Sequence, residues 1–125
     1  MADRPDIALK RIYDPVAAGD GARILVERLW PRGISKSDRL VDHWVKDVAP
    51  SAALRRWYGH RPDLWEEFRR RYEEELAGNA VGIGEIEALV KGGRATFVFA
   101  ARDRERNSAV VLRAYLLEPS RWGGA

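Results

Sequence analysis

Ala95-Thr96-Phe97-Val98-Phe99-Ala100-Ala101 is a continuously apolar run that carries β-branched and aromatic residues. A strand of this composition has no polar face, so we expect it at the centre of a sheet that is covered on both sides, as in parallel sheets. Arg102 and Asp103 follow directly, and Asn107 or Ser108 is expected to cap the helix that comes next. The run therefore predicts a buried strand whose carboxyl end presents polar side chains.

A second apolar strand runs into a turn in the stretch Ile24-Leu25-Val26-Glu27-Arg28-Leu29-Trp30-Pro31-Arg32-Gly33. Pro31 cannot donate to a sheet and restricts Trp30 to extended geometry, so pairing should end there. Gly33 permits a backbone angle that other residues resist. In open α/β sheets ligands bind beyond the carboxyl ends of strands, where Arg32 would hold an anion and Trp30 would form a wall. Alternatively, Trp30 covers the core and Arg32 pairs with a carboxylate.

The rest of the chain predicts further strands and helices. Residues 7–13 form a first strand, and the short loop after it makes the first two strands either antiparallel or not neighbours. Residues 40–50 fit a helix and a strand nearly equally well, and we favour a strand through 44–48 that leads into a helix over Ala52–Tyr58. The clearest helix spans residues 62–77.

We therefore expect an α/β fold in which a small, mainly parallel sheet is flanked by helices in three layers, in a Rossmann-like manner. Residues 1–125 form a single domain, and residues 118–125 form a loose C-terminal tail.

The composition describes a globular chain without cysteine. Hydrophobic residues make up 46% and charged residues 33%, which is typical of a folded domain. The lack of cysteine excludes disulfides and thiol nucleophiles and fits a reducing compartment. His43 and His60 are too few for a multi-histidine metal site, so we expect no metal and no other cofactor. With no signal-peptide core and no run of membrane-spanning length, we expect a cytoplasmic protein without membrane contact.

In a parallel sheet three strand ends would converge on one candidate site. Next to the Trp-Pro-Arg-Gly turn they bring Asp47 with Ser51, and Asp103 with Asn107. Helix N-termini at Ser51 and Asn107 would favour an anion through free N–H groups and the helix dipole. Asp47 or Asp103 is the candidate general base, and the alternative for each is a capping or ion-pair role.

The same site has further candidate residues. His60 is the other candidate for acid–base chemistry, and its alternative is a capping or packing role. Trp57 offers a second aromatic wall, and Gly33 belongs to the ligand-binding turn with Trp30 and Arg32. No phosphate loop, dinucleotide fingerprint, nucleophile elbow or metal-binding pattern is present, so whether a reaction is catalysed stays open.

Three functions are compatible with these features. The first is a site for an anionic or phosphorylated small molecule at the carboxyl ends of the strands. The second is a nucleic-acid-binding module, against which the small basic excess of 22 − 19 = 3 and the glutamates beside Arg69-Arg70-Arg71 argue. The third is a non-enzymatic interaction protein, as a monomer or homodimer, with Trp44, Trp65 or Trp122 exposed as an anchor.

Several motifs occur together in one order: Val26-Glu27-Arg28-Leu29-Trp30-Pro31-Arg32-Gly33, Lys46-Asp47-Val48-Ala49-Pro50-Ser51, Trp57-Tyr58-Gly59-His60, and Ala100-Ala101 followed by Asp103 and Asn107. Through them, residues 7–117 resemble the YeaO-like branch of the domain-of-unknown-function family 488. The resemblance implies a small cytoplasmic bacterial or archaeal α/β protein. It also implies a cluster formed by Trp30, Arg32, Asp47, Ser51, His60, Asp103 and Asn107.

Two positions depart from the YeaO-like pattern. Arg106 stands where a histidine is frequent, and Ser108 stands where a polar amide or histidine is frequent. A related branch carries cysteine near Phe99 and a Cys-His pair near Asn107-Ser108, and this chain has neither. Thiol or metal chemistry of that branch therefore does not transfer to this chain.

Overall fold

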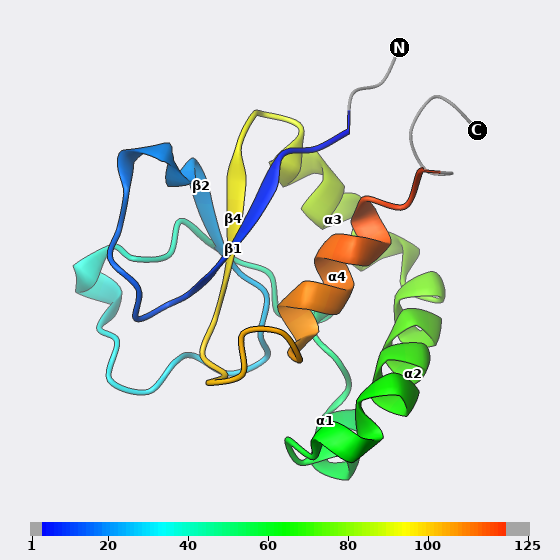
Figure 1. The fold of residues 1–125 in the computed structure, drawn as a ribbon. Coiled ribbons are helices and arrows are strands. Elements are labelled where there is room, and N and C mark those ends of the chain that lie inside the picture. Colours follow the sequence, from blue (N-terminus) through cyan, green and yellow to red (C-terminus); the bar gives the residue numbers. More distant parts are fainter. Residues whose placement is uncertain (1–3, 120–125) are drawn as a thin grey trace.

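The computed structural model describes residues 4–119, which form a four-stranded parallel sheet with four α-helices (Figure 1). The strands are β1 (Ile7–Arg11), β2 (Ala22–Leu25), β3 (His43–Trp44) and β4 (Ala95–Phe99). The α-helices are α1 (Ala52–Tyr58), α2 (Trp65–Ala77), α3 (Ala80–Val90) and α4 (Ser108–Leu116). Short 3₁₀ helices lie at Ala18–Asp20, Lys36–Asp38, Lys46–Val48 and Pro62–Leu64. The predicted α/β fold with a small parallel sheet is confirmed.

β4 lies inside the sheet, whose strand order is β1-β4-β2-β3. Its Phe97 pairs with Leu9 of β1 on one side and with Ile24 of β2 on the other, and all of its residues are buried. The predicted buried central strand is therefore confirmed. Because β4 separates β1 from β2, these two strands are not neighbours, which was one of the two arrangements left open for them.

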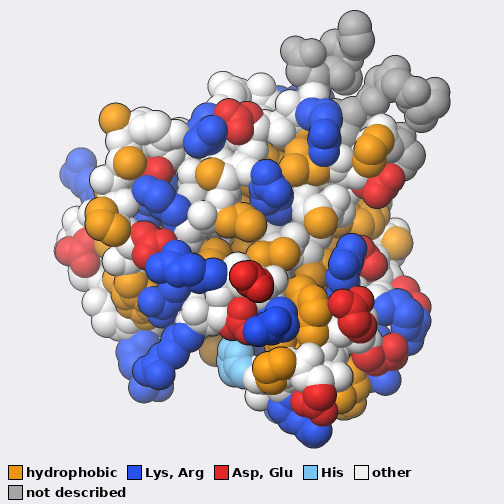
Figure 2. Space-filling model, viewed as in Figure 1, with side chains coloured by type: hydrophobic (Ala, Val, Ile, Leu, Met, Phe, Trp, Pro, Cys, Tyr) orange, Lys and Arg blue, Asp and Glu red, His pale blue; other side chains and the backbone are white. Residues whose placement is uncertain are grey.

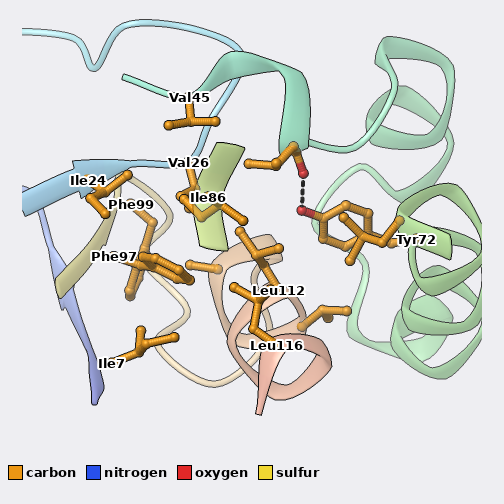
Figure 3. Close-up of a cluster of buried hydrophobic side chains, with 14 of the residues drawn as sticks. Ile7, Ile24, Val26, Val45, Tyr72, Ile86, Phe97, Phe99, Leu112 and Leu116 are labelled. Atoms are coloured by element: carbon orange, nitrogen blue, oxygen red, sulfur yellow. Dashed lines mark hydrogen bonds between the residues drawn. The ribbon is translucent and has the colours of Figure 1, made fainter. Parts of the chain in front are cut away.

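The four α-helices gather on one face of the sheet, where they cover the main apolar core (Figures 1 and 3). Side chains alternate between the faces of a strand, so Phe97 and Phe99 of β4 point to the same side as Ile24 of β2. The side chains that meet them from the helices are Tyr72, Ile86, Leu112 and Leu116. The Tyr72 hydroxyl donates to the carbonyl of Val48, so α2 is fixed to the chain just before α1.

The opposite face is covered by the segment between β2 and β3, which differs from the three-layer arrangement expected with helices on both sides. Leu25 and Val98 face this layer. The side chains that pack against them are Trp30, Ile34, Leu40, Val41 and Trp44. Because Pro31 and Gly33 disfavour a continuous α-helix in residues 26–42, the segment crosses the sheet as loop and 3₁₀ helix.

A buried ion pair also lies on this second face. Arg23 Nη1 is 2.6 Å from Asp20 Oδ2, and Lys10 Nζ is 2.9 Å from Asp20 Oδ1. Thr96 donates its hydroxyl hydrogen to the Asp20 carbonyl at 2.7 Å. The hydrogen bond from Lys10 is the main cause that lowers the pKa of Asp20 to about 2. The network connects β1, β2 and β4 through polar contacts on this face, whereas the other face is held by the apolar core.

Residues 44–48, predicted as a strand, are extended only at their start. β3 ends at Trp44, and Lys46–Val48 forms a 3₁₀ helix. Val45 still donates its N–H to the Leu25 carbonyl at 2.9 Å. In an extended strand Val45 and Val48 would point to opposite faces, whereas the 3₁₀ turn buries both in the helical core. The strand therefore ends at Trp44, because a 3₁₀ turn buries both valines and a continued strand would bury only one of them.

The predicted helix boundaries are mostly confirmed. Ser51 Oγ accepts the Leu54 N–H at 3.1 Å at the start of α1, and Gly59 ends this helix with φ 54°. Asn107 caps α4 through its side-chain oxygen. The helix predicted over 62–77 begins with a 3₁₀ turn at Pro62–Leu64 before α2. Residues 120–125 of the predicted tail lie outside the described residues, as does Trp122, and no helix within 4–119 is long and apolar enough to cross a bilayer.

Gly21→Ala is expected to destabilise the protein by about 2 kcal/mol or more. Gly21 has φ +64°, and a Cβ at this position would lie 1.9 Å from the Arg94 carbonyl oxygen, which accepts the Ala22 N–H. Gly19 is the matched control, because a Cβ there meets nothing within 4 Å. Urea unfolding of both variants measures the difference, and equal stabilities would contradict the close approach of this turn to Arg94.

Candidate functional site

A cavity of about 610 Å³ opens at the carboxyl edge of the sheet. Its walls come from residues that follow β2, residues that follow β4, the start of α4, α1 with the turn after it, and the first half of α2. Trp30, Tyr58 and Phe68 supply aromatic surface to these walls. The cavity therefore lies where parallel α/β sheets hold their ligands.

Trp30 and Arg32 both line the cavity, as predicted for the turn that follows β2. Hydrogen bonds hold this turn in place: the Tyr13 hydroxyl donates to the Arg32 carbonyl at 2.8 Å, and Trp30 Nε1 donates to the Ile34 carbonyl at 2.7 Å. Trp30 also packs against the second face of the sheet, so it contributes to both the core and the cavity. Gly33 has φ 80°, the left-handed angle that its place in the turn requires, but it is not on the cavity wall.

Glu27 is a half-buried carboxylate on the cavity wall that the sequence pattern did not indicate. Its Oε1 accepts the Ala100 N–H at 2.8 Å, and its carbonyl accepts the Trp44 indole N–H at 2.7 Å. Burial raises the pKa of Glu27, while the Ala100 hydrogen bond and the charge of Arg55 oppose the rise. The available signal was an acidic residue directly after the apolar residues Ile24-Leu25-Val26.

Three exposed arginines, Arg32, Arg55 and Arg56, line the same cavity, and the charge of Arg55 acts on the Glu27 carboxylate. Within residues 4–119 their guanidinium groups make no hydrogen bond or ion pair, although all three residues line the cavity. Arg106 also lines the cavity, but its Nε donates to Asp103 Oδ2 at 2.9 Å. Three guanidinium groups are therefore available to a bound anion.

His60 and Asn107 are the other predicted residues on the cavity wall. His60 has φ 57°, a left-handed angle that is uncommon outside glycine, and it directly follows Gly59, which is left-handed as well. Asn107 Oδ1 accepts the Val110 N–H at 3.1 Å, and its Nδ2 donates to the Asp103 carbonyl at 2.9 Å. The N-terminus of α4 thus faces the cavity, as predicted.

The remaining predicted residues lie away from the cavity. Ser51 and Trp57 border a separate hollow between α1 and α2, where the Arg71 guanidinium carbon lies 4.2 Å from the Trp57 ring centre. Asp47 lies exposed in the 3₁₀ helix that replaces the predicted strand end. Asp103 accepts the N–H groups of Glu105 and Arg106, and these two bonds lower its pKa.

The structure therefore brings Trp30, Arg32, His60 and Asn107 together. Asp103 contributes indirectly, because its carboxylate holds Arg106. No group of three or more His, Asp or Glu side chains in the described part of the chain could hold a metal ion.

Comparisons with known proteins place the chain in a family. A family model described as "Inactive DUF488-N3 subclade" matches residues 6–121. The chain belongs to the DUF488 family. It is 43% identical over 116 residues to "Uncharacterized protein Rv3073c" of Mycobacterium tuberculosis, a match that covers 93% of this chain and 98% of the relative. It is also 38% identical over 111 residues to "Uncharacterized protein YeaO" of Escherichia coli, a match that covers 89% of this chain and 96% of the relative. No solved structure gives a significant match.

The resemblance to the YeaO-like branch of DUF488 is thereby confirmed. Both positions at which this DUF488 chain departs from the expected YeaO-like pattern, Arg106 and Ser108, lie on the cavity wall. Arg106 and Ser108 therefore differ from the pattern at the candidate site, and neither residue lies in a strand of the sheet.

Glu27→Gln is expected to gain stability relative to the wild type as the pH rises above about 4.5, the ordinary pKa of glutamate. The pKa of Glu27 is higher in the folded state than in the unfolded state, so the folded state binds more protons in this interval and loses stability as the pH increases. The variant lacks this loss. Urea unfolding of both proteins from pH 4 to pH 8 gives the difference, and a difference that does not change with pH would refute the role of burial.

Proposed function

We propose that the protein binds an anionic small molecule, such as a phosphorylated compound, in the cavity at the carboxyl ends of β2 and β4. The observation that carries this proposal is the set of guanidinium groups of Arg32, Arg55 and Arg56, which line the cavity without a protein partner among residues 4–119. Arginine binds phosphate and carboxylate through paired, charge-assisted hydrogen bonds. All three arginines are exposed, so an anion would take the place of water at each guanidinium.

The size and surface of the cavity suit a small organic ligand. Its volume of about 610 Å³ lies within the range of about 300–1,000 Å³ that is usual for such sites. Trp30, Tyr58 and Phe68 provide apolar and aromatic wall, and the arginines provide the charged groups. Apolar walls with a few polar groups are the common composition of ligand pockets.

Binding without catalysis is the form of this function that we favour. The family model is described as an inactive subclade, and Asp103, a predicted general base, is engaged with Arg106 instead of facing the cavity. We expect the protein to act in the cytoplasm, because a chain without cysteine suits a reducing compartment.

The charge distribution argues against a nucleic-acid interface. On α2, Arg70 pairs with Glu67 and Glu74, and Arg71 also pairs with Glu67. Figure 2 shows basic and acidic side chains interspersed over the face in view, without an extended area of one sign. Strong binding to nucleic acid generally needs a continuous basic surface.

The double variant Arg55→Gln/Arg56→Gln is expected to bind anions at least about tenfold more weakly than the wild type, because two charge-assisted contacts are lost. The ligands are inorganic phosphate, sugar phosphates, nucleoside monophosphates and small carboxylates. Thermal shift identifies those that bind, and calorimetry measures their dissociation constants.

The matched control removes the same kind of charge away from the cavity. Arg69→Gln lies on α2, where Arg69 Nε is 3.7 Å from Glu73 Oε2, and it should bind as the wild type does. If Arg69→Gln weakens anion binding as much as the double variant does, the loss of affinity comes from the overall charge and not from the cavity. If no anion binds to the wild type, the proposal is wrong, and the interaction protein becomes the better hypothesis.

A further inference from the structure

Glu27, the acidic residue on the cavity wall, accepts one hydrogen bond at its backbone carbonyl and one at its side chain. The carbonyl of Glu27 accepts the indole N–H of Trp44, and Oε1 accepts the N–H of Ala100. The two donors come from β3 and from the residue after β4. The Ala100 hydrogen bond therefore orients the Glu27 carboxylate on the cavity wall.

The second carboxylate oxygen, Oε2, has no hydrogen-bond donor among residues 4–119. Arg55 is close enough to influence Glu27 through its charge, yet the two make no ion pair. An ionised carboxylate offers about four acceptor positions, and because Glu27 is only half-buried and Oε2 is not among the buried unpaired side-chain atoms of the described residues, these positions are open to solvent on the cavity wall. A donor group on a bound molecule would fill them in place of water.

The same carboxylate opposes a ligand that is only an anion. A phosphate drawn in by Arg32, Arg55 and Arg56 enters a cavity whose wall also carries the negative charge of Glu27. In a partly buried site, repulsion between like charges is weakly screened. A positively charged or N–H-bearing group on the ligand would convert this repulsion into an attraction.

We infer that the ligand carries an amino group as well as its anionic group, with the anion on the arginines and the amino group on Glu27. This inference rests on the proposed anion-binding function and gives it a ligand class, amino-bearing phosphates or carboxylates. Glu27 acts as the specificity-determining residue that separates such compounds from anions of the same size without an amino group.

Matched pairs of ligands test the inference by calorimetry. The pairs are glucosamine 6-phosphate with glucose 6-phosphate, O-phosphoserine with 3-phosphoglycerate, and GMP with IMP, which differ at an amino group. Wild type should bind the amino-bearing member of at least one pair about tenfold or more tightly, as expected for a hydrogen bond to a charged group. Glu27→Gln should abolish this preference, because it weakens the binding of the amino-bearing member and, by removing the negative charge that repels an anion, tightens the binding of the amino-free member.

The possible results separate this inference from the proposed function. If the wild type binds anions but shows no preference within any pair, or if Glu27→Gln keeps the preference, the inference is overturned and the anion site remains. If no member of any pair binds, the inference falls together with the proposed function. Circular dichroism checks that Glu27→Gln is folded. Should it not fold, Glu27→Asp retains the charge on a shorter side chain and should weaken the preference, and an unchanged preference there would also overturn the inference.

Discussion

The burial of β4 is the constraint on which the rest of the structure depends. A strand between two others must have its backbone polar groups paired within the sheet, and β1 and β2 provide these pairs. Beyond the end of β4 the pairing passes to side chains. Ala100 donates its N–H to the Glu27 carboxylate, and Arg11 donates to the carbonyls of Ala100 and Ala101 at 3.0 and 2.8 Å. The cavity lies where backbone pairing gives way to these side chains.

The parts of the fold that the sequence predicts well are those with strong local signals. The apolar composition of residues 95–101 is enough to identify a central strand, and the side chains of Ser51 and Asn107 identify the starts of α1 and α4. Residues 44–48 gave a wrong prediction because a run of five residues fits period 2 and a helical spacing about equally well. The choice depends on where Val45 and Val48 find apolar neighbours, which is a property of the assembled core.

The candidate site is predictable to a smaller extent. The place of Trp30 and Arg32 at the edge of the sheet could be predicted because a proline and a glycine fix the turn that carries them. Glu27 was missed because an acidic residue after an apolar strand has the same local sequence whether it faces solvent or a cavity. Among residues 4–119 the side chains of Arg55 and Arg56 have no hydrogen-bond or ion-pair partner, whereas Asp103 binds Arg106. Neither arrangement follows from spacing along the chain.

The contact between Trp30 and Trp44 has a consequence for how the cavity can be observed. The two indole rings lie 5.3 Å apart in an edge-to-face arrangement, and the Lys36 ammonium group lies within 6 Å of both ring centres. Indole emission is sensitive to nearby charge and to energy transfer between neighbouring rings. One ring of this pair lines the cavity and the other donates its N–H to Glu27, so the protein contains its own fluorescent reporter of whatever enters.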